Sequence, residues 1–259
     1  MCEEPEQKEM VILEWNFTPA DYFEEPINLL RDNYEINIED GRARANIEAK
    51  HFDSNPDLRT KIHESLNSRF QAAQIINRKT YELSESSMSR IHENGAVSQT
   101  IFVKAAELIV TANSPDIVIT ESNGEVAGDS KRERIAKREA LANLVEKHSP
   151  GNPTIKSIMA SWETSLREPD NVLSSLYDIR EALKREFGNE NAAYSALGLS
   201  RKSWKELGRL ANYEPLKQGR HPGWHANELR DATEDELIQA RRIAQTLIEQ
   251  YLDYLERKG

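Results

Sequence analysis

Two histidines and several cations lie together in a stretch with the residue types of a site that acts on phosphate. It reads Arg209-Leu-Ala-Asn-Tyr-Glu-Pro-Leu-Lys-Gln-Gly-Arg-His-Pro-Gly-Trp-His225 and lies shortly before a predicted helix. Backbone N–H groups and the helix dipole favour anions at a helix N-terminus. A histidine near neutral pKa can move a proton, and a guanidinium can stabilise charge on a phosphate. We therefore take Arg220, His221 and His225 as candidate catalytic residues.

The order of the predicted helices, the polar segment before the last one and a short motif carry a resemblance to a known family. Residues from about 153 to 257 resemble the HEPN superfamily, small helical bundles of many prokaryotic defence and toxin proteins. Ribonucleases of that family carry an arginine and a histidine separated by a few residues, as in Arg220-His-Pro-Gly-Trp-His225. The resemblance implies a metal-independent endoribonuclease, doubled in a homodimer, in which this pair promotes attack of an RNA 2′-hydroxyl on the adjacent phosphodiester. A structural alternative is that Arg220 and His221 tie an ordered loop to the bundle through hydrogen bonds.

Charge is distributed unevenly along the chain. The formal net charge is −10, of which −9 belongs to residues 1–149 and −1 to residues 150–259. Residues 201–230 carry seven basic and three acidic side chains, a net charge of +4. Such an island is compatible with phosphate contacts. The candidate nucleic-acid-binding residues in it are Arg201, Lys202, Lys205, Arg209 and Lys217.

The same region supports a second interpretation, a DNA-binding helix-turn-helix. Residues 191–208 contain a small-residue helix, a turn glycine at Gly198, a cap at Ser200 and a cationic second helix. Arg201, Lys202 and Lys205 would then face phosphates or base edges. A purely structural turn between two bundle helices gives the same pattern.

Neither a metal site nor a cofactor site is expected. His221 and His225 are four residues apart with Glu228 three further on, but Pro222-Gly223 opposes the helix that would bring them together. Cys2 is the single cysteine, so a cysteine zinc site within one chain is excluded. We find no glycine-rich phosphate loop, serine elbow or paired-carboxylate signature.

The composition predicts a cytoplasmic protein without a membrane segment. The richest apolar stretch, residues 101–112, contains Lys104 and Glu107 and is too short to span a bilayer. The acidic N-terminus lacks the basic and apolar regions of a signal peptide.

Two domains are predicted, an α+β sheet domain over residues 1–149 and a helical bundle over residues 150–259, separated by Ser149-Pro-Gly-Asn-Pro153. In the first, alternating runs flank Glu39-Asp-Gly41, which is typical of a hairpin. We expect a mostly antiparallel sheet packed on a helix that starts near Pro56. The expected strands are residues 11–17, 34–38, 43–47, 81–83, 87–92, 98–103, 108–111 and 117–120.

Helix start signals organise the rest of the chain. Capping boxes are predicted at Ser130-Lys-Arg-Glu133 and Thr233-Glu-Asp-Glu236, and Pro153 suits a first helical turn. The last helix has a long apolar stripe, so we expect it to be the central helix of the bundle. Besides RNA and DNA binding, a third possibility is a non-catalytic interaction protein that presents its acidic N-terminal domain to a protein partner.

Overall fold

The computed structural model describes residues 8–94, 96–100, 118–120, 126–220 and 228–259. The chain is α+β, which confirms the predicted fold class. Its contacts divide it into a sheet unit, residues 1–70 and 81–135, and a helical unit, residues 71–80 and 136–259. This division falls inside two helices, α2 (Leu58–Asn77) and α3 (Ser130–His148). The domain boundary at residues 149–150 stays a prediction.

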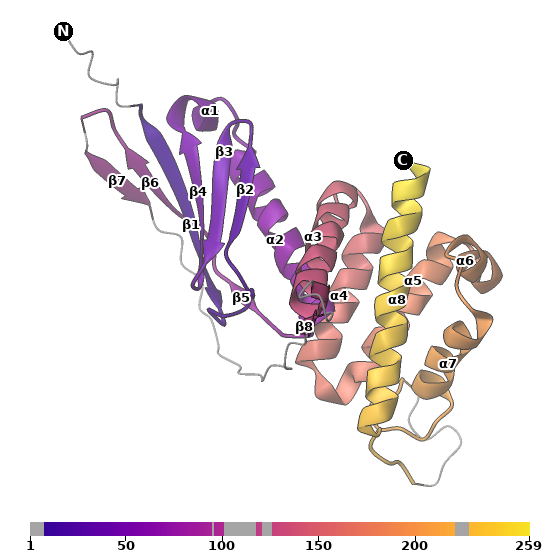
Figure 1. The fold of residues 1–259 in the computed structure, drawn as a ribbon. Coiled ribbons are helices and arrows are strands. Elements are labelled where there is room, and N and C mark those ends of the chain that lie inside the picture. The colour runs from indigo at the N-terminus through magenta and orange to yellow at the C-terminus, as the bar shows by residue number, and fades with distance from the viewer. Residues whose placement is uncertain (1–7, 95, 101–117, 121–125, 221–227) are drawn as a thin grey trace. The chain divides into compact units, whose positions relative to one another are not determined.

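An antiparallel sheet of seven strands forms the sheet unit (Figure 1). The strands are β1 (Met10–Thr18), β2 (Ile27–Arg31), β3 (Tyr34–Glu39), β4 (Arg42–Glu48), β5 (Glu82–Leu83), β6 (Ser87–Ile91) and β7 (Val97–Thr100). Their order is β2-β3-β4-β1-β6-β7, and β5 pairs with the end of β1. The predicted hairpin joins β3 to β4, and its two turn residues, Asp40 and Gly41, both have positive φ, as a type I′ turn requires.

One face of the sheet is buried under the first part of α2. Alternate residues of β1 are buried, namely Val11, Leu13, Trp15 and Phe17. On α2 the buried residues recur at intervals of four, at Leu58, Ile62, Leu66 and Phe70. The rings of Phe17 and Phe70 are 5.1 Å apart. Buried residues thus recur at every second position in β1 and at every fourth in α2. Each element therefore contributes one apolar face to a common core.

Some elements differ from the sequence prediction. Strand β2 and the short helix α1 (Ala49–Asp53) were not predicted. The strand expected at residues 117–120 is present as β8 (Val118–Thr120), but it pairs with β9 (Val126–Asp129) in a separate two-stranded sheet. The expectation that it extends the large sheet is wrong, and local pairing has the smaller loop-closure cost. The strand predicted at residues 108–111 lies outside the described residues.

The helical unit combines the ends of α2 and α3 with five further helices. These are α4 (Pro153–Arg167), α5 (Val172–Glu186), α6 (Glu190–Ala196), α7 (Arg201–Asn212) and α8 (Glu234–Lys258), with a 3-10 turn at Pro169–Asn171. Helix α5 packs against α4, α6, α7 and α8, so it is the central helix, and the expectation that α8 has this place is wrong. Within the described residues, no helix is long and apolar enough to cross a membrane.

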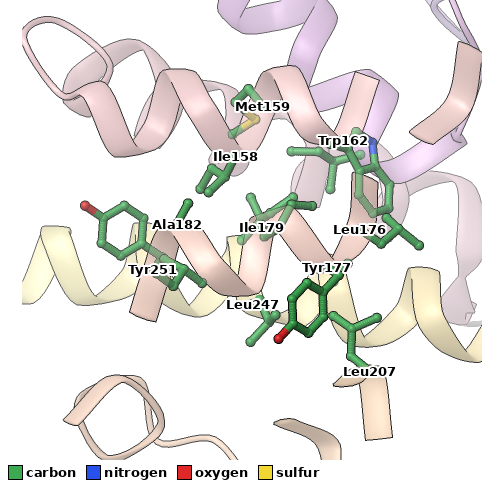
Figure 2. Close-up of a cluster of buried hydrophobic side chains, with 14 of the residues drawn as sticks. Ile158, Met159, Trp162, Leu176, Tyr177, Ile179, Ala182, Leu207, Leu247 and Tyr251 are labelled. Atoms are coloured by element: carbon green, nitrogen blue, oxygen red, sulfur yellow. The ribbon is translucent and has the colours of Figure 1, made fainter. Parts of the chain in front are cut away.

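Side chains from every α-helix from α2 to α8 meet in the core of this unit. Figure 2 shows Ile158 and Trp162 of α4 beside Ile179 of α5 and Leu247 of α8. Trp162 is 1% exposed, and its indole N–H donates to the Gln74 carbonyl at the end of α2, 3.4 Å away. The last turns of α2 therefore belong to the same core as the bundle helices.

One of the two predicted capping boxes is present and the other is not. Helix α8 begins with the predicted capping box, formed by Thr233 and Glu236. Helix α3, by contrast, is capped by the Asp129 carboxylate, which accepts hydrogen bonds from the backbone N–H groups of Lys131 and Arg132 at 3.0 and 3.1 Å. The capping box predicted from Ser130 is wrong because Ser130 is already helical.

Candidate functional site

The connection between α7 and α8 is held at both ends by backbone hydrogen bonds. We call residues 213–220 and 228–232 the loop base. Leu216 and Arg230 form a parallel bridge, in which Arg230 donates to the Pro215 carbonyl and accepts from Lys217, both at 3.0 Å. Gln218 links this bridge to α5, because its carbonyl accepts from the Ser174 N–H at 3.3 Å. The predicted irregular segment thus has a fixed backbone where it leaves and rejoins the bundle.

Arg220 lies at the last described position of the first half of the loop base. Its backbone N–H donates to the Ala211 carbonyl in the last turn of α7, at 2.7 Å. The preceding residue, Gly219, runs so close to the helix that a Cβ there would be 3.0 Å from the Ala211 oxygen and 3.1 Å from the Leu216 oxygen. Glycine at this position therefore permits the approach that places Arg220.

The Arg220 side chain is exposed and lies over an aromatic ring. Its guanidinium carbon is 5.4 Å from the centroid of the Tyr177 ring on α5. Burial raises the pKa of the Tyr177 phenol, so the ring stays neutral at physiological pH. No carboxylate among the described residues lies within ion-pair distance of Arg220. His221 and His225 lie outside the described residues.

A buried arginine, Arg180, also packs on the Tyr177 ring. Its guanidinium carbon is 5.0 Å from the Tyr177 ring centroid and 5.1 Å from that of Trp204. Its Nη2 donates to Glu190 at 2.8 Å, and the Trp204 indole N–H donates to the same carboxylate oxygen at 3.3 Å. Two rings and one carboxylate thus hold the Arg180 charge, which allows its burial.

Gly208 of α7 leaves room for this guanidinium. A Cβ at Gly208 would lie 2.3 Å from Arg180 Nη1. The sequence interpretation missed Arg180, Glu190 and Gly208. One signal was present: glycine inside a helix costs about 1 kcal/mol relative to alanine, so an interior glycine indicates a packing constraint.

Three of the seven cations in the basic island are neutralised by neighbouring carboxylates. Arg209 pairs with Glu206 at 2.8 Å and also with Glu214. Lys217 pairs with Asp231 at 2.9 Å, and Arg230 pairs with Glu236 at 2.6 Å. Arg209 and Lys217, both predicted to bind nucleic acid, therefore take part in ion pairs of the protein itself.

The other three predicted nucleic-acid-binding residues lie on α7. Arg201, Lys202 and Lys205 are exposed, and no ion pair joins them to any residue that the structure describes. The opposite face of α7 is buried through Trp204, Leu207, Leu210 and Ala211. A turn with Gly198 at a φ of +64° precedes the helix, and the Ser200 hydroxyl caps it by accepting from the Ser203 N–H at 3.0 Å. Helix α7 thus presents a cationic outer face.

Neither a metal site nor a relative adds to these observations. In the part of the chain that the structure describes, no three histidine, cysteine or acidic side chains are grouped so that they could hold a metal ion. Comparisons with protein-family models, with curated proteins and with solved structures gave no match.

The ion pair that closes the loop base predicts a pH dependence. The hydrogen bonds from Arg230 are the largest reason that the pKa of Glu236 falls from 4.5 to about 2. A carboxylate whose pKa is lower in the folded protein stabilises the fold fully above its unfolded pKa and loses this effect as pH falls. We expect the free energy of unfolding to decrease between about pH 5 and pH 2, measured by urea unfolding at each pH. Glu236→Gln should flatten this decrease, and an equally steep one in that variant would contradict the assignment.

Proposed function

We propose that the helical unit acts on RNA as a HEPN-like, metal-independent endoribonuclease, with Arg220 as the phosphate-binding residue. The arrangement of Arg220 supports this most directly. Its backbone is fixed by Ala211, its guanidinium lies over Tyr177, and no described carboxylate neutralises it. Guanidinium N–H groups that are positioned but not ion-paired suit a phosphate oxygen.

The proposed reaction divides the chemistry between the arginine and a histidine. A neutral imidazole of His225 or His221 takes the proton of an RNA 2′-hydroxyl, and the oxygen attacks the adjacent phosphorus. The bond from phosphorus to the 5′-oxygen breaks, and that oxygen takes a proton. Arg220 stabilises the charge that develops on the phosphoryl oxygens. The products are a 2′,3′-cyclic phosphate end and a 5′-hydroxyl end.

The cationic face of α7 supports strand binding next to this site. Arg201, Lys202 and Lys205 belong to the helix whose last turn holds the Arg220 backbone. At about 1.5 Å per residue, the twelve residues of α7 span roughly 18 Å, enough to contact several phosphates of one strand. We therefore propose that these three side chains, in the first half of α7, bind the RNA backbone on one side of the reacting phosphate.

The test is cleavage of an end-labelled single-stranded RNA by the full chain in the presence of EDTA. We expect Arg220→Ala to reduce the cleavage rate about 100-fold or more, in the range seen when one charge-stabilising donor is removed. His225→Ala should have a similar effect. The matched control is Arg185→Ala, which removes an exposed arginine from the last turn of α5. Cleavage that is equal in Arg220→Ala and the unchanged protein would contradict the proposal.

Other outcomes of the same experiment would select the alternative functions. Binding of duplex DNA without RNA cleavage, weakened and less salt-dependent in Arg201→Ala/Lys205→Ala, would favour the helix-turn-helix interpretation. If neither nucleic acid is bound, the non-catalytic interaction protein remains. The homodimer is part of the ribonuclease proposal, and light scattering on the purified chain tests it.

A further inference from the structure

A serine, a histidine and a glutamate of the sheet unit contact one another in series. Ser98 Oγ lies 2.7 Å from Nε2 of His92. The other ring nitrogen of His92, Nδ1, lies 2.6 Å from Oε1 of Glu9. A carboxylate beside Nδ1 favours the neutral tautomer with its proton on that nitrogen, which leaves Nε2 to accept from the serine hydroxyl. We call these three residues the Ser98 triad.

Strand pairing brings the triad together. Glu9 directly precedes β1, His92 directly follows β6, and Ser98 belongs to β7. Val11 of β1 lies opposite Arg90 of β6, so Glu9 and His92, each two residues from this pair at the same end, share its face of the sheet. Ser98 lies opposite Arg90 and therefore on that face too. Three segments that are neighbours in the sheet thus supply one member each (Figure 1).

An arginine holds the glutamate in position. Arg90 Nη1 lies 3.6 Å from Glu9 Oε2, whereas Oε1 of the same carboxylate faces His92. Arg90 Nη1 also donates to Asp53 Oδ2 at 3.1 Å, and Arg90 Nη2 donates to the other oxygen of Asp53. Asp53 is the last residue of α1. The carboxylate that orients the histidine is therefore itself fixed by a contact network that reaches a helix.

The serine is accessible to a reactant. Ser98 is exposed, and the side chain of His92 is 40% exposed. β7 is the outermost strand on its side of the described sheet. A small molecule in solution can therefore reach Ser98 while the contacts between the three side chains stay in place.

We propose that Ser98 is a nucleophile for acyl transfer from small carboxylic esters, with His92 as general base and Glu9 as its positioning residue. The Ser98 oxygen bonds to the ester carbonyl carbon while its proton passes to His92 Nε2. His92 then gives this proton to the leaving alkoxide as the ester bond breaks. Water attacks the acyl-serine with the same base, which releases the carboxylic acid and restores the serine.

The exposure of the triad favours esters over amides as substrates. Electrostatic stabilisation of a developing oxyanion is weaker in a site that water can enter than in a closed one. An alkoxide or phenolate leaves more readily than an amine, so an ester needs less of this stabilisation. The triad lies in the sheet unit and does not depend on the ribonuclease activity proposed for the helical unit.

Labelling of the full chain with a fluorophosphonate probe, followed by peptide mass spectrometry, tests the nucleophile. An activated serine oxygen bonds to the phosphorus of this probe and fluoride leaves. We expect label on Ser98, formed about 100-fold more slowly in His92→Gln, because the general base is lost. Glu9→Gln should slow labelling about tenfold or more, because the histidine loses its orienting carboxylate. Ser98 that stays unlabelled, or is labelled equally fast in His92→Gln, would overturn the proposal.

Hydrolysis of p-nitrophenyl acetate is the second readout. We expect Ser98→Ala to lower the rate above the buffer background about tenfold or more. The matched control is Ser89→Ala, which removes a hydroxyl from β6 on the opposite face of the sheet and should leave the rate unchanged. Equal rates in Ser98→Ala and the unchanged chain would contradict the assignment. Because Ser98 is exposed, the urea unfolding midpoint of Ser98→Ala should match that of the unchanged chain, which excludes misfolding as the cause of a lost rate.

Discussion

Gly208→Ala is expected to destabilise the helical unit by about 2–3 kcal/mol, although alanine is the better helix former by about 1 kcal/mol. The reason is the 2.3 Å separation between a Cβ at this position and Arg180 Nη1. The guanidinium cannot simply move aside, because it packs on the Tyr177 and Trp204 rings and binds Glu190. The measurement is urea unfolding of the full chain, followed by far-ultraviolet circular dichroism.

A double-mutant cycle separates this clash from any general effect of the substitution. In an Arg180→Ala background the guanidinium is absent, so Gly208→Ala should become neutral or stabilising. The change of sign is the result that tests the packing argument. The same destabilisation in both backgrounds would show that another contact of Gly208 is responsible.

Trp162→Ala is expected to cost about 3–5 kcal/mol, the largest effect of any single substitution considered. The side chain is 1% exposed in the core of the helical unit, and its indole N–H donates to the Gln74 carbonyl. Truncation therefore leaves a cavity and removes a donor from a buried acceptor. The change is measured by the same unfolding experiment.

Two further variants separate the causes of this loss of stability. Trp162→Phe keeps most of the buried apolar surface and removes the indole donor, so it should cost about 1–2 kcal/mol. Tyr213→Ala truncates an aromatic side chain that is 62% exposed in the same unit, and it should change stability by about 0.5 kcal/mol or less. A Trp162→Ala cost as small as that of Tyr213→Ala would contradict the burial of Trp162.

Much of the fold was predictable because local patterns match the tertiary environment. The alternation in β1 and the stripe in α2 each describe one buried face, and the turn residues Asp40 and Gly41 fix the hairpin between β3 and β4. Helix α7 begins where the sequence predicts, because Ser200 caps it and Trp204 starts its buried face. These signals depend on a few neighbouring residues and require no knowledge of distant contacts.

The wrong predictions concern features that the local sequence pattern alone does not determine. The capping box predicted from Ser130 did not show that Asp129, one residue earlier, caps α3. The central place of α5 depends on how four other helices pack against it, which its own apolar stripe does not contain. The pairing of β8 with β9 is likewise a choice among possible strand partners.

The candidate site shows the same limit most clearly. Sequence counting identified seven cations in one island, but it did not show that Lys217 and Asp231, fourteen residues apart, form an ion pair. Nor did it indicate that Tyr177, more than forty positions before Arg220, lies beneath that guanidinium. Charge in a sequence is a sum, whereas a binding surface depends on which charges remain unpaired after folding.

The bridge between Leu216 and Arg230 makes the stability of the bundle insensitive to the length of the loop that it closes. The bridge joins the two ends of the loop between Leu216 and Arg230. Inserting residues into this loop therefore raises the free energy of loop closure only slowly, by about 0.6 kcal/mol for each doubling of loop length. Neither anchor needs to move to accommodate a new sequence. The length of the intervening stretch should therefore have little effect on the stability of the bundle.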